Sequence, residues 1–212
     1  MEITNSTDVL FLGSTSKSRR NLLHLAGISH KLLLHSSSEC VAVPSDNFDD
    51  YVLAIACDKM QHLKLPELVD VDRDYIFVLT ADTLVKGLSS GHVLGKPADL
   101  EHAKSILRLI HSQPLQVSTG CCLKFFEKSS GNWNEKASEC WVTGALVEFC
   151  VSEDDIDLYF QKLPGALNAS GASVIDDFGQ NFLKSINGSY SAVVGLPLFE
   201  LRKKLKLMGF KF

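Results

Sequence analysis

Residues 9–23 read VLFLGSTSKSRRNLL, and this stretch predicts the start of an α/β fold. The apolar run 9–13 is bounded by polar residues, as expected of a buried strand, and leucines then recur at helical spacing up to Gly27. The turn between them is rich in hydroxyl groups and contains two arginines. Such a turn suits a phosphate, which free N–H groups and the helix N-terminus attract, or it is a serine cap before a solvated basic helix face.

Apolar runs of strand length alternate with segments of helical periodicity along the rest of the chain. Strands are predicted at 31–35, 75–80, 115–126, 141–150 and 181–186, and helices at 49–63, about 100–110, 152–162 and after Pro197. The turn residues KGLSSGH predict a hairpin between 85 and 93. This order favours an α/β protein with a mixed twisted sheet and flanking helices over a purely parallel sheet.

Length and charge limit the possible functions. With 212 residues and 45% hydrophobic content, the chain can bury one core, as a single domain or as two small lobes. The net charge of −4 provides no broad basic field, so a large nucleic-acid interface is not expected. The start MEITNSTDVL has no basic region followed by a long apolar stretch, and no run reaches membrane-spanning length. We therefore expect a cytoplasmic protein that does not bind membranes.

The six cysteines show no CxxC pair and no Cys/His metal spacing. Cys121 and Cys122 are adjacent, which suits neither a zinc site nor a simple bridge. The cysteines are interpreted as reduced and mostly buried thiols.

Polar groups occur at four predicted ends of apolar elements. They are the turn STSKSRR, the pair Ser38 and Glu39, the segment 81–83, and the pair Gly95 and Lys96. Open α/β sheets gather ligand groups at strand ends, so these groups are expected to converge. Cations and hydroxyls suit a polyphosphate, and carboxylates suit a magnesium ion and an attacking water. Each group also has a structural interpretation: Asp82 as a turn cap, Lys96 as a surface residue and Glu39 as a loop carboxylate.

The order of these motifs resembles the Maf proteins, which are nucleoside triphosphate pyrophosphatases. The motifs are STSKSRRNLL, SSE, DKM, ADTLV, VLGKP, SGASVID and INGSYSAVVGLPL, and they cover nearly the whole chain. The resemblance implies one Maf-like domain over 1–212, with two lobes around a central cleft. It further implies hydrolysis of the α–β phosphoanhydride of a nucleoside triphosphate with a divalent metal, usually magnesium, and a possible homodimer.

The resemblance also assigns roles to individual residues. Asp82 corresponds to the family's acidic proton acceptor and would activate water or help hold magnesium, with Glu39 as a second metal or water ligand. The other matching positions are Ser14 and Arg19, expected to bind phosphate, and Lys59 and Lys96, expected to offset charge on the leaving pyrophosphate. Thr83 is also expected to contact substrate.

The segments differ in the base that they favour. Lys17 replaces a common proline, and the spacing around Ser18 resembles the subgroup that hydrolyses methylated guanosine triphosphates such as 7-methyl-GTP. ADT and INGSY instead resemble the subgroup acting on dTTP and UTP. Asp176 stands where glutamine or glutamate is usual, and it can accept a hydrogen bond from a base but cannot donate one as an amide does. We expect a pyrimidine or modified nucleotide, with pyrimidines favoured.

Two alternatives remain. One is an enzyme of the inosine/xanthosine triphosphate pyrophosphatase type, and the other is a nucleotide-binding regulator without turnover. The presence of both carboxylates and both lysines disfavours the regulator, because a protein that only binds has no need of a metal-activated water.

Overall fold

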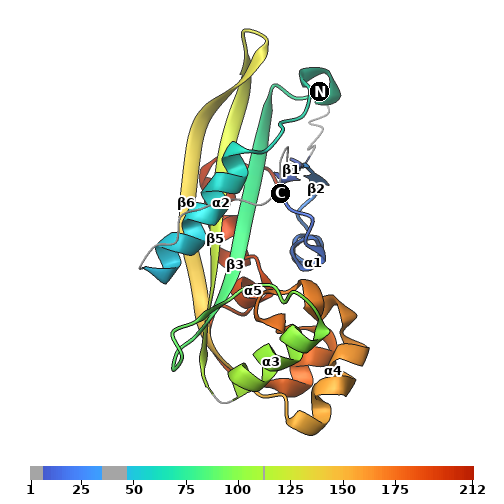
Figure 1. Cartoon of the computed structure of the whole chain (residues 1–212). Coiled ribbons are helices and arrows are strands. Elements are labelled where there is room, and N and C mark those ends of the chain that lie inside the picture. Colours follow the sequence, from blue (N-terminus) through green and yellow to red (C-terminus); the bar gives the residue numbers. More distant parts are fainter. Residues whose placement is uncertain (1–6, 35–46, 112) are drawn as a thin grey trace. The chain divides into compact units, whose positions relative to one another are not determined.

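The computed structural model describes residues 7–34, 47–111 and 113–212 (Figure 1). These residues form an α/β fold in which helices flank a mixed sheet. They fall into two compact units, and each is described by itself. Unit 1 comprises Met1–Asp82, Gly120–Val142 and Gly195–Phe212, and unit 2 comprises Thr83–Thr119 and Thr143–Val194.

Among the described residues, seven strands form one sheet in the order β2-β1-β3-β5-β6-β7, and β4 pairs with β3. Their bounds are β1 (Leu10–Leu12), β2 (His30–Leu32), β3 (Tyr75–Gly87), β4 (Val93–Leu94), β5 (Leu115–Ser129), β6 (Asn132–Phe149) and β7 (Leu183–Gly188). β1 pairs in parallel with β2 and β3, whereas the β3–β4 and β6–β7 pairs are antiparallel. The expected mixed sheet and the expected hairpin are confirmed.

The predicted helices are also present, with small shifts at their ends. They are α1 (Lys17–Leu25), α2 (Phe48–Gln61), α3 (Leu100–His111), α4 (Ile156–Lys162) and α6 (Leu198–Leu207), and α5 (Tyr190–Val194) was not predicted. The start of the helix predicted at 152–162 is instead a 3-10 turn, η2 (Glu153–Asp155). Within the described ranges, no helix is both long and apolar enough to cross a bilayer.

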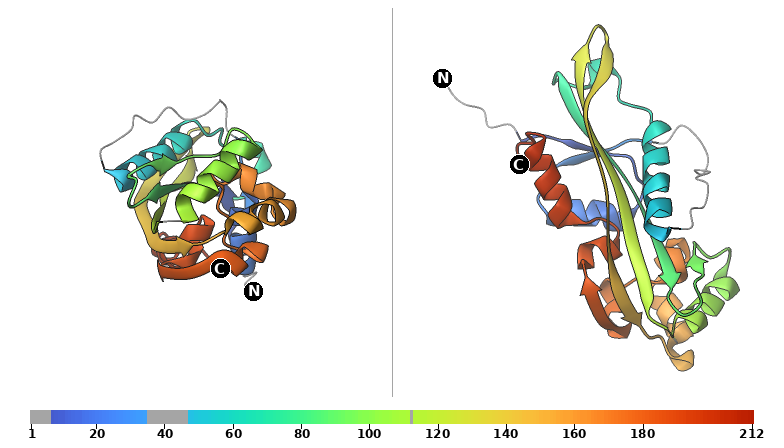
Figure 2. Two further views of the ribbon diagram at one scale, coloured as in Figure 1. Left: turned by 60° about the horizontal axis from the view of Figure 1, so that its bottom comes forward. Right: turned by 90° about the vertical axis from the view of Figure 1, so that its left-hand side faces the viewer.

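In unit 1, α2 and α6 lie on opposite faces of the sheet (Figure 2). On the α2 face, a Cβ at Gly120 of β5 would lie 2.8 Å from the Val52 carbonyl oxygen, so glycine lets the helix backbone approach the strand closely. On the α6 face, Lys204 pairs with Glu139 of β6 at 2.7 Å. A cluster of buried apolar side chains that includes Met60 packs within this unit.

Unit 2 has its own core, to which α3 contributes an apolar face. Ala103 and Leu107 of this helix are fully buried, because residues four apart lie on one face. Tyr159 of α4 is also fully buried, and its hydroxyl donates to the Ala172 carbonyl oxygen at 3.0 Å.

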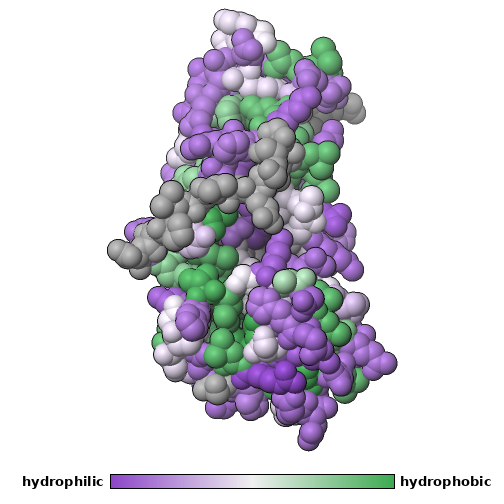
Figure 3. All heavy atoms as spheres, viewed as in Figure 1, coloured by the Kyte–Doolittle hydropathy of each residue, from purple (hydrophilic) through white to green (hydrophobic). Residues whose placement is uncertain are grey.

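Hydrophilic and hydrophobic side chains are interspersed on the surface drawn in Figure 3.

The strand limits that differ most from the sequence-based prediction are those of β3 and β6. β3 continues to Gly87, so Asp82 lies inside the strand and not at its end. The polar stretch 128–139, which lies between the strands predicted at 115–126 and 141–150, belongs mostly to β5 and β6, with a tight turn at Ser130 and Gly131. Both turn residues have positive φ, at 53° and 74°, which a two-residue hairpin connection requires.

Candidate active site

The site begins where β1 ends beside β3. Leu12 stands opposite Leu79 in the parallel register, and the Gly13 N–H donates to the Leu79 carbonyl oxygen at 2.8 Å. A Cβ at Gly13 would lie 2.8 Å from Thr80 Cγ2, so a larger residue would push these side chains apart. The chain therefore leaves β1 next to the part of β3 that carries Asp82.

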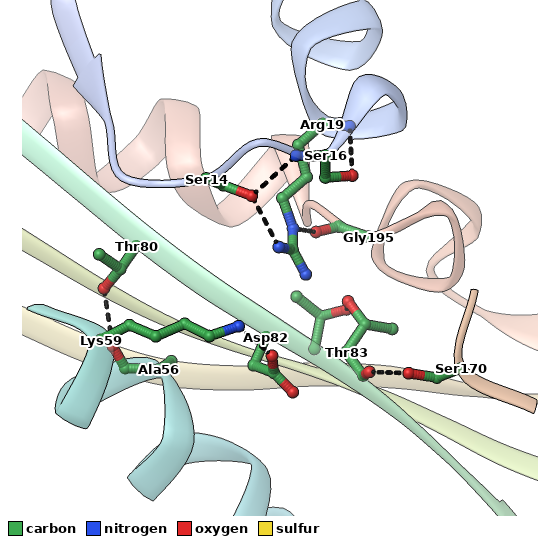
Figure 4. Close-up of polar contacts among 11 residues, drawn as sticks. Ser14, Ser16, Arg19, Ala56, Lys59, Thr80, Asp82, Thr83, Ser170 and Gly195 are labelled. Carbon is green, nitrogen blue, oxygen red and sulfur yellow. Dashed lines mark hydrogen bonds and ion pairs between the residues drawn. The ribbon is translucent and has the colours of Figure 1, made fainter. Parts of the chain in front are cut away.

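The turn after Gly13 folds around the side chain of Arg19 (Figure 4). Arg19 Nη1 donates to Ser14 Oγ at 3.0 Å, and Nε donates to the Gly195 carbonyl oxygen at 2.8 Å. Ser14 and Arg19 are only 7% and 8% exposed. Ser16 caps α1 by accepting from the Arg19 backbone N–H at 3.4 Å. The serine cap therefore exists, but Arg19 is buried and braced and does not lie on a solvated face.

A buried hydroxyl positions Lys59 beside Asp82. Thr80 on β3 donates to the carbonyl oxygen of Ala56 on α2 at 2.7 Å. Alternation along the strand puts Asp82 on the same face as Thr80, and Lys59 follows Ala56 by about one helical turn. Lys59 Nζ forms a salt bridge with Asp82 Oδ1, as Figure 4 shows. The contact at Thr80 thus fixes the position of α2 that lets this pair form.

Burial changes the electrostatics of Arg19. Loss of contact with water lowers the pKa of Arg19, and the negative charge of Asp82 opposes this effect. Arg19 and Asp82 therefore belong to one electrostatic cluster in unit 1, together with Lys59. Fixed cations in a site from which water is largely excluded interact strongly with an anion and need little reorganisation. The arrangement is suited to holding a phosphate group.

The donor chemistry of the described residues fits magnesium. Mg²⁺ prefers oxygen ligands and is usually bound by one or two carboxylates together with substrate phosphates and waters. Asp82 provides a carboxylate whose Oδ1 contacts Lys59, so Oδ2 is the atom that could ligate a metal ion. Glu39, the other predicted metal ligand, lies outside the described residues.

In unit 2, one loop contacts two predicted site segments. Ser170 Oγ donates to the Thr83 carbonyl oxygen at 2.9 Å, and the Gly171 N–H donates to the Gly95 carbonyl oxygen at 2.9 Å. Gly171 has a φ of +67°, a conformation that favours glycine. The small-residue loop therefore holds Thr83 and the backbone before Lys96 near each other, while the Lys96 side chain is exposed.

Thr83 and Asp176 are held differently within unit 2. The hydroxyls of Thr83 and Thr119 lie 2.8 Å apart, and Thr119 donates to the Ala192 carbonyl oxygen at 2.7 Å, so Thr83 is the donor of the pair. Asp176 is half-buried, and burial raises the pKa of its carboxyl group. Burial raises the pKa of Tyr190 most, and the negative charge of Asp176 raises it further. The Asp176 carboxyl group therefore lies close enough to the Tyr190 phenol to interact with it electrostatically.

The structure brings part of the predicted set together. Ser14, Arg19, Lys59 and Asp82 meet in unit 1, and Ser18 is half-buried in the first turn of α1. Sequence reasoning missed the roles of Gly195 and Thr80. Gly195 acts through its backbone carbonyl and gives no side-chain signal, although it lies inside the motif GSYSAVVGLPL.

Comparison with known proteins adds independent information. Residues 9–208 match the family model described as Maf-like protein. The chain is 34% identical over 213 residues to a dTTP/UTP pyrophosphatase of Colwellia psychrerythraea, covering 99% of this chain and 94% of the relative. It is 33% identical to the dTTP/UTP pyrophosphatase of Shigella dysenteriae, covering 90% of this chain and 88% of the relative. For the protein of that name from Acholeplasma laidlawii, the identity is 34%, with 93% and 95% covered.

Proposed function

The chain belongs to the Maf-like protein family, and we propose that it is a nucleoside triphosphate pyrophosphatase that prefers dTTP and UTP. In this reaction water cleaves the α–β phosphoanhydride, and the products are the nucleoside monophosphate and pyrophosphate. The enzyme would act in nucleotide metabolism as a cytoplasmic hydrolase, with one Maf-like domain and the ability to form a homodimer.

One observation carries the proposal for the site. A carboxylate on β3, paired with Lys59, lies in the same electrostatic cluster as a buried guanidinium that Ser14 and Gly195 brace. Cleavage of a phosphoanhydride needs an acceptor for the proton of water and cations for the negative charge on phosphate. Both kinds of group are present in this cluster.

The residues of unit 1 then have distinct tasks. Asp82 accepts a proton from the attacking water, and Lys59 orients that carboxylate through the salt bridge at Oδ1. Arg19 and Ser14 bind phosphate oxygens, and the Gly195 carbonyl keeps the guanidinium in place. Holding the reactants in position supplies much of the rate acceleration in phosphoryl chemistry.

The remaining predicted residues complete the proposal. Lys96 offsets charge on the departing pyrophosphate, Thr83 contacts substrate, and Ser18 and Asp176 contribute to base selection. Asp82, with Glu39 as a second ligand, would hold Mg²⁺. The ion, when bound, would neutralise phosphate charge and lower the pKa of a bound water.

A substrate panel tests this function. Purified protein with Mg²⁺ is assayed for pyrophosphate release from dTTP, UTP, dCTP, ITP, XTP and 7-methyl-GTP. We expect the highest kcat/KM for dTTP and UTP. A preference for ITP and XTP would support the alternative enzyme type, and preference for 7-methyl-GTP would contradict the pyrimidine assignment. Nucleotide binding without pyrophosphate release would support the regulator.

A further inference from the structure

Three cysteines from separate parts of the chain meet in unit 1. Cys57 lies on α2, Cys122 on β5 and Cys140 on β6, and their sulfur atoms all lie within 4.8 Å of one another. The sulfurs of Cys57 and Cys140 are 3.6 Å apart. No role in the proposed hydrolysis falls to any of these thiols.

The fold explains why these cysteines meet although the sequence separates them. Alternation along β5 puts Gly120 and Cys122 on the face that α2 covers, and Gly120 lets the helix backbone come close. On β6, Glu139 faces α6 through Lys204, so the next residue, Cys140, faces α2. The sheet and one helix thus direct three sulfurs to one point.

The sulfur geometry is close to that of a thiolate metal site. A tetrahedral zinc site has Zn–S distances of about 2.3 Å, which places its sulfurs about 3.8 Å apart. The distance of 3.6 Å and the limit of 4.8 Å bracket this spacing, so the sulfur atoms need to move by at most about 1 Å. We propose that Cys57, Cys122 and Cys140 form a three-thiolate Zn²⁺ site whose fourth position takes water or a small exogenous ligand.

A charged side chain lies close to the cluster. Lys124 interacts electrostatically with the three thiols, and it also forms a salt bridge with Glu135 at 2.6 Å. Three thiolates and one Zn²⁺ carry a net charge of −1, which Lys124 offsets only in part because it already pairs with Glu135. Zn²⁺ binding displaces the remaining thiol protons to solvent, and no electron transfer is required.

The solvent exposure of the three cysteines indicates from which side a fourth zinc ligand can enter. Cys122 is buried, Cys57 is half-buried and Cys140 is exposed, so the cluster opens toward solvent at Cys140. A fourth ligand can enter from that side. Sites with three protein ligands and one open position are typical of zinc that binds further molecules, whereas four protein ligands are typical of structural zinc.

Zinc titration of the full chain tests the proposal. Reduced, metal-free protein is titrated with Zn²⁺ against a chromophoric chelator, and with Co²⁺ to detect thiolate-to-metal charge-transfer absorption. We expect one equivalent bound and the charge-transfer band. Cys140→Ser, at an exposed position, should weaken Zn²⁺ binding by at least about 100-fold, the upper end of what loss of an outer-shell partner costs.

Cys150→Ser is the matched control, because Cys150 is half-buried in unit 2 and outside the cluster. It should bind Zn²⁺ as the wild type does. Equal Zn²⁺ affinity of the wild type and Cys140→Ser would overturn the proposal, as would a reduced wild type without the charge-transfer band. These readouts do not depend on nucleotide hydrolysis, so they separate this proposal from the proposed function.

Discussion

The predicted site residues of unit 1 and unit 2 are held in different ways. In unit 1, Arg19 is buried and braced by two hydrogen bonds, and Lys59 is paired with Asp82. In unit 2, Lys96 is exposed and Asp176 is half-buried. Thr83 of unit 2 is held by a hydrogen bond between its hydroxyl and that of Thr119.

This difference separates rigidly held from adaptable residues within the predicted set. Charged groups fixed before substrate arrives stabilise developing charge without reorganisation, which suits the reaction centre. Exposed side chains lose conformational freedom when they bind, so they contribute less per contact. We therefore expect substitutions in unit 1 to impair chemistry and folding, and substitutions in unit 2 to change substrate use.

The largest effect is expected for Asp82→Asn. This change removes the proton acceptor and keeps the shape, so kcat should fall by about 10²- to 10⁴-fold, the usual contribution of general acid–base catalysis. Steady-state kinetics with dTTP measures it, and circular dichroism checks the fold. Asp154→Asn, at an exposed position of η2, is the control and should leave kcat unchanged. Normal turnover of folded Asp82→Asn would remove this carboxylate from the mechanism.

Arg19→Lys should have the next largest effect. Lysine keeps the charge but cannot reach Ser14 Oγ and the Gly195 carbonyl oxygen with the same geometry. Leaving buried polar groups without partners costs about 1–3 kcal/mol, so thermal unfolding should shift to lower temperature and kcat/KM should fall. Arg202→Lys, which alters an arginine stacked on Phe212, is the comparison. Equal effects of the two changes would contradict the special role of Arg19.

Lys96→Ala should change activity without changing stability. The side chain is exposed, so its loss should alter the free energy of unfolding by less than about 0.5 kcal/mol. A fall in kcat/KM of about tenfold, or 1.4 kcal/mol, is expected from loss of one cation near phosphate. Lys162→Ala, an exposed lysine at the end of α4, should leave both quantities unchanged. Unchanged kcat/KM in Lys96→Ala would place this lysine outside the site.

The smallest effect is expected for Asp176→Asn. A carboxylate accepts from the N–H of thymine or uracil, whereas an amide can also donate to the acceptor that cytosine presents at this position. The preference for dTTP over dCTP should fall by about 3- to 10-fold, which corresponds to one hydrogen bond. Because burial raises the pKa of Asp176, the wild type should also lose preference as pH falls and the carboxyl group becomes protonated. A preference that neither change affects would exclude Asp176 from base selection.

Local sequence patterns predicted which helices and strands are present better than they predicted the residues at which these begin and end. Most helices were found because their apolar residues recur at helical spacing, as Ala103 and Leu107 do in α3. Asp82 was placed at the end of a strand because a carboxylate seldom continues an apolar run, and its pairing with Lys59 shows why this one can. The polar strand β6 was partly missed because its two faces have no buried alternation near the turn at Gly131.

Contacts between distant segments could not be predicted in the same way. The motif order indicated that Ser14, Arg19, Lys59 and Asp82 belong together, but the Gly195 carbonyl acts through the backbone and leaves no signal. The thiol cluster is a similar case. Its cysteines lack metal-binding spacing in sequence, and they meet only because α2 packs on β5 and β6.

The most direct test of the central claim is the product analysis of a single reaction. Purified protein is incubated with dTTP and Mg²⁺, and the products are separated by ion-exchange chromatography and identified by ³¹P NMR. The account predicts equal amounts of dTMP and pyrophosphate from the wild type, and almost none from Asp82→Asn. Formation of dTDP and inorganic phosphate, or equal turnover by the two proteins, would contradict it.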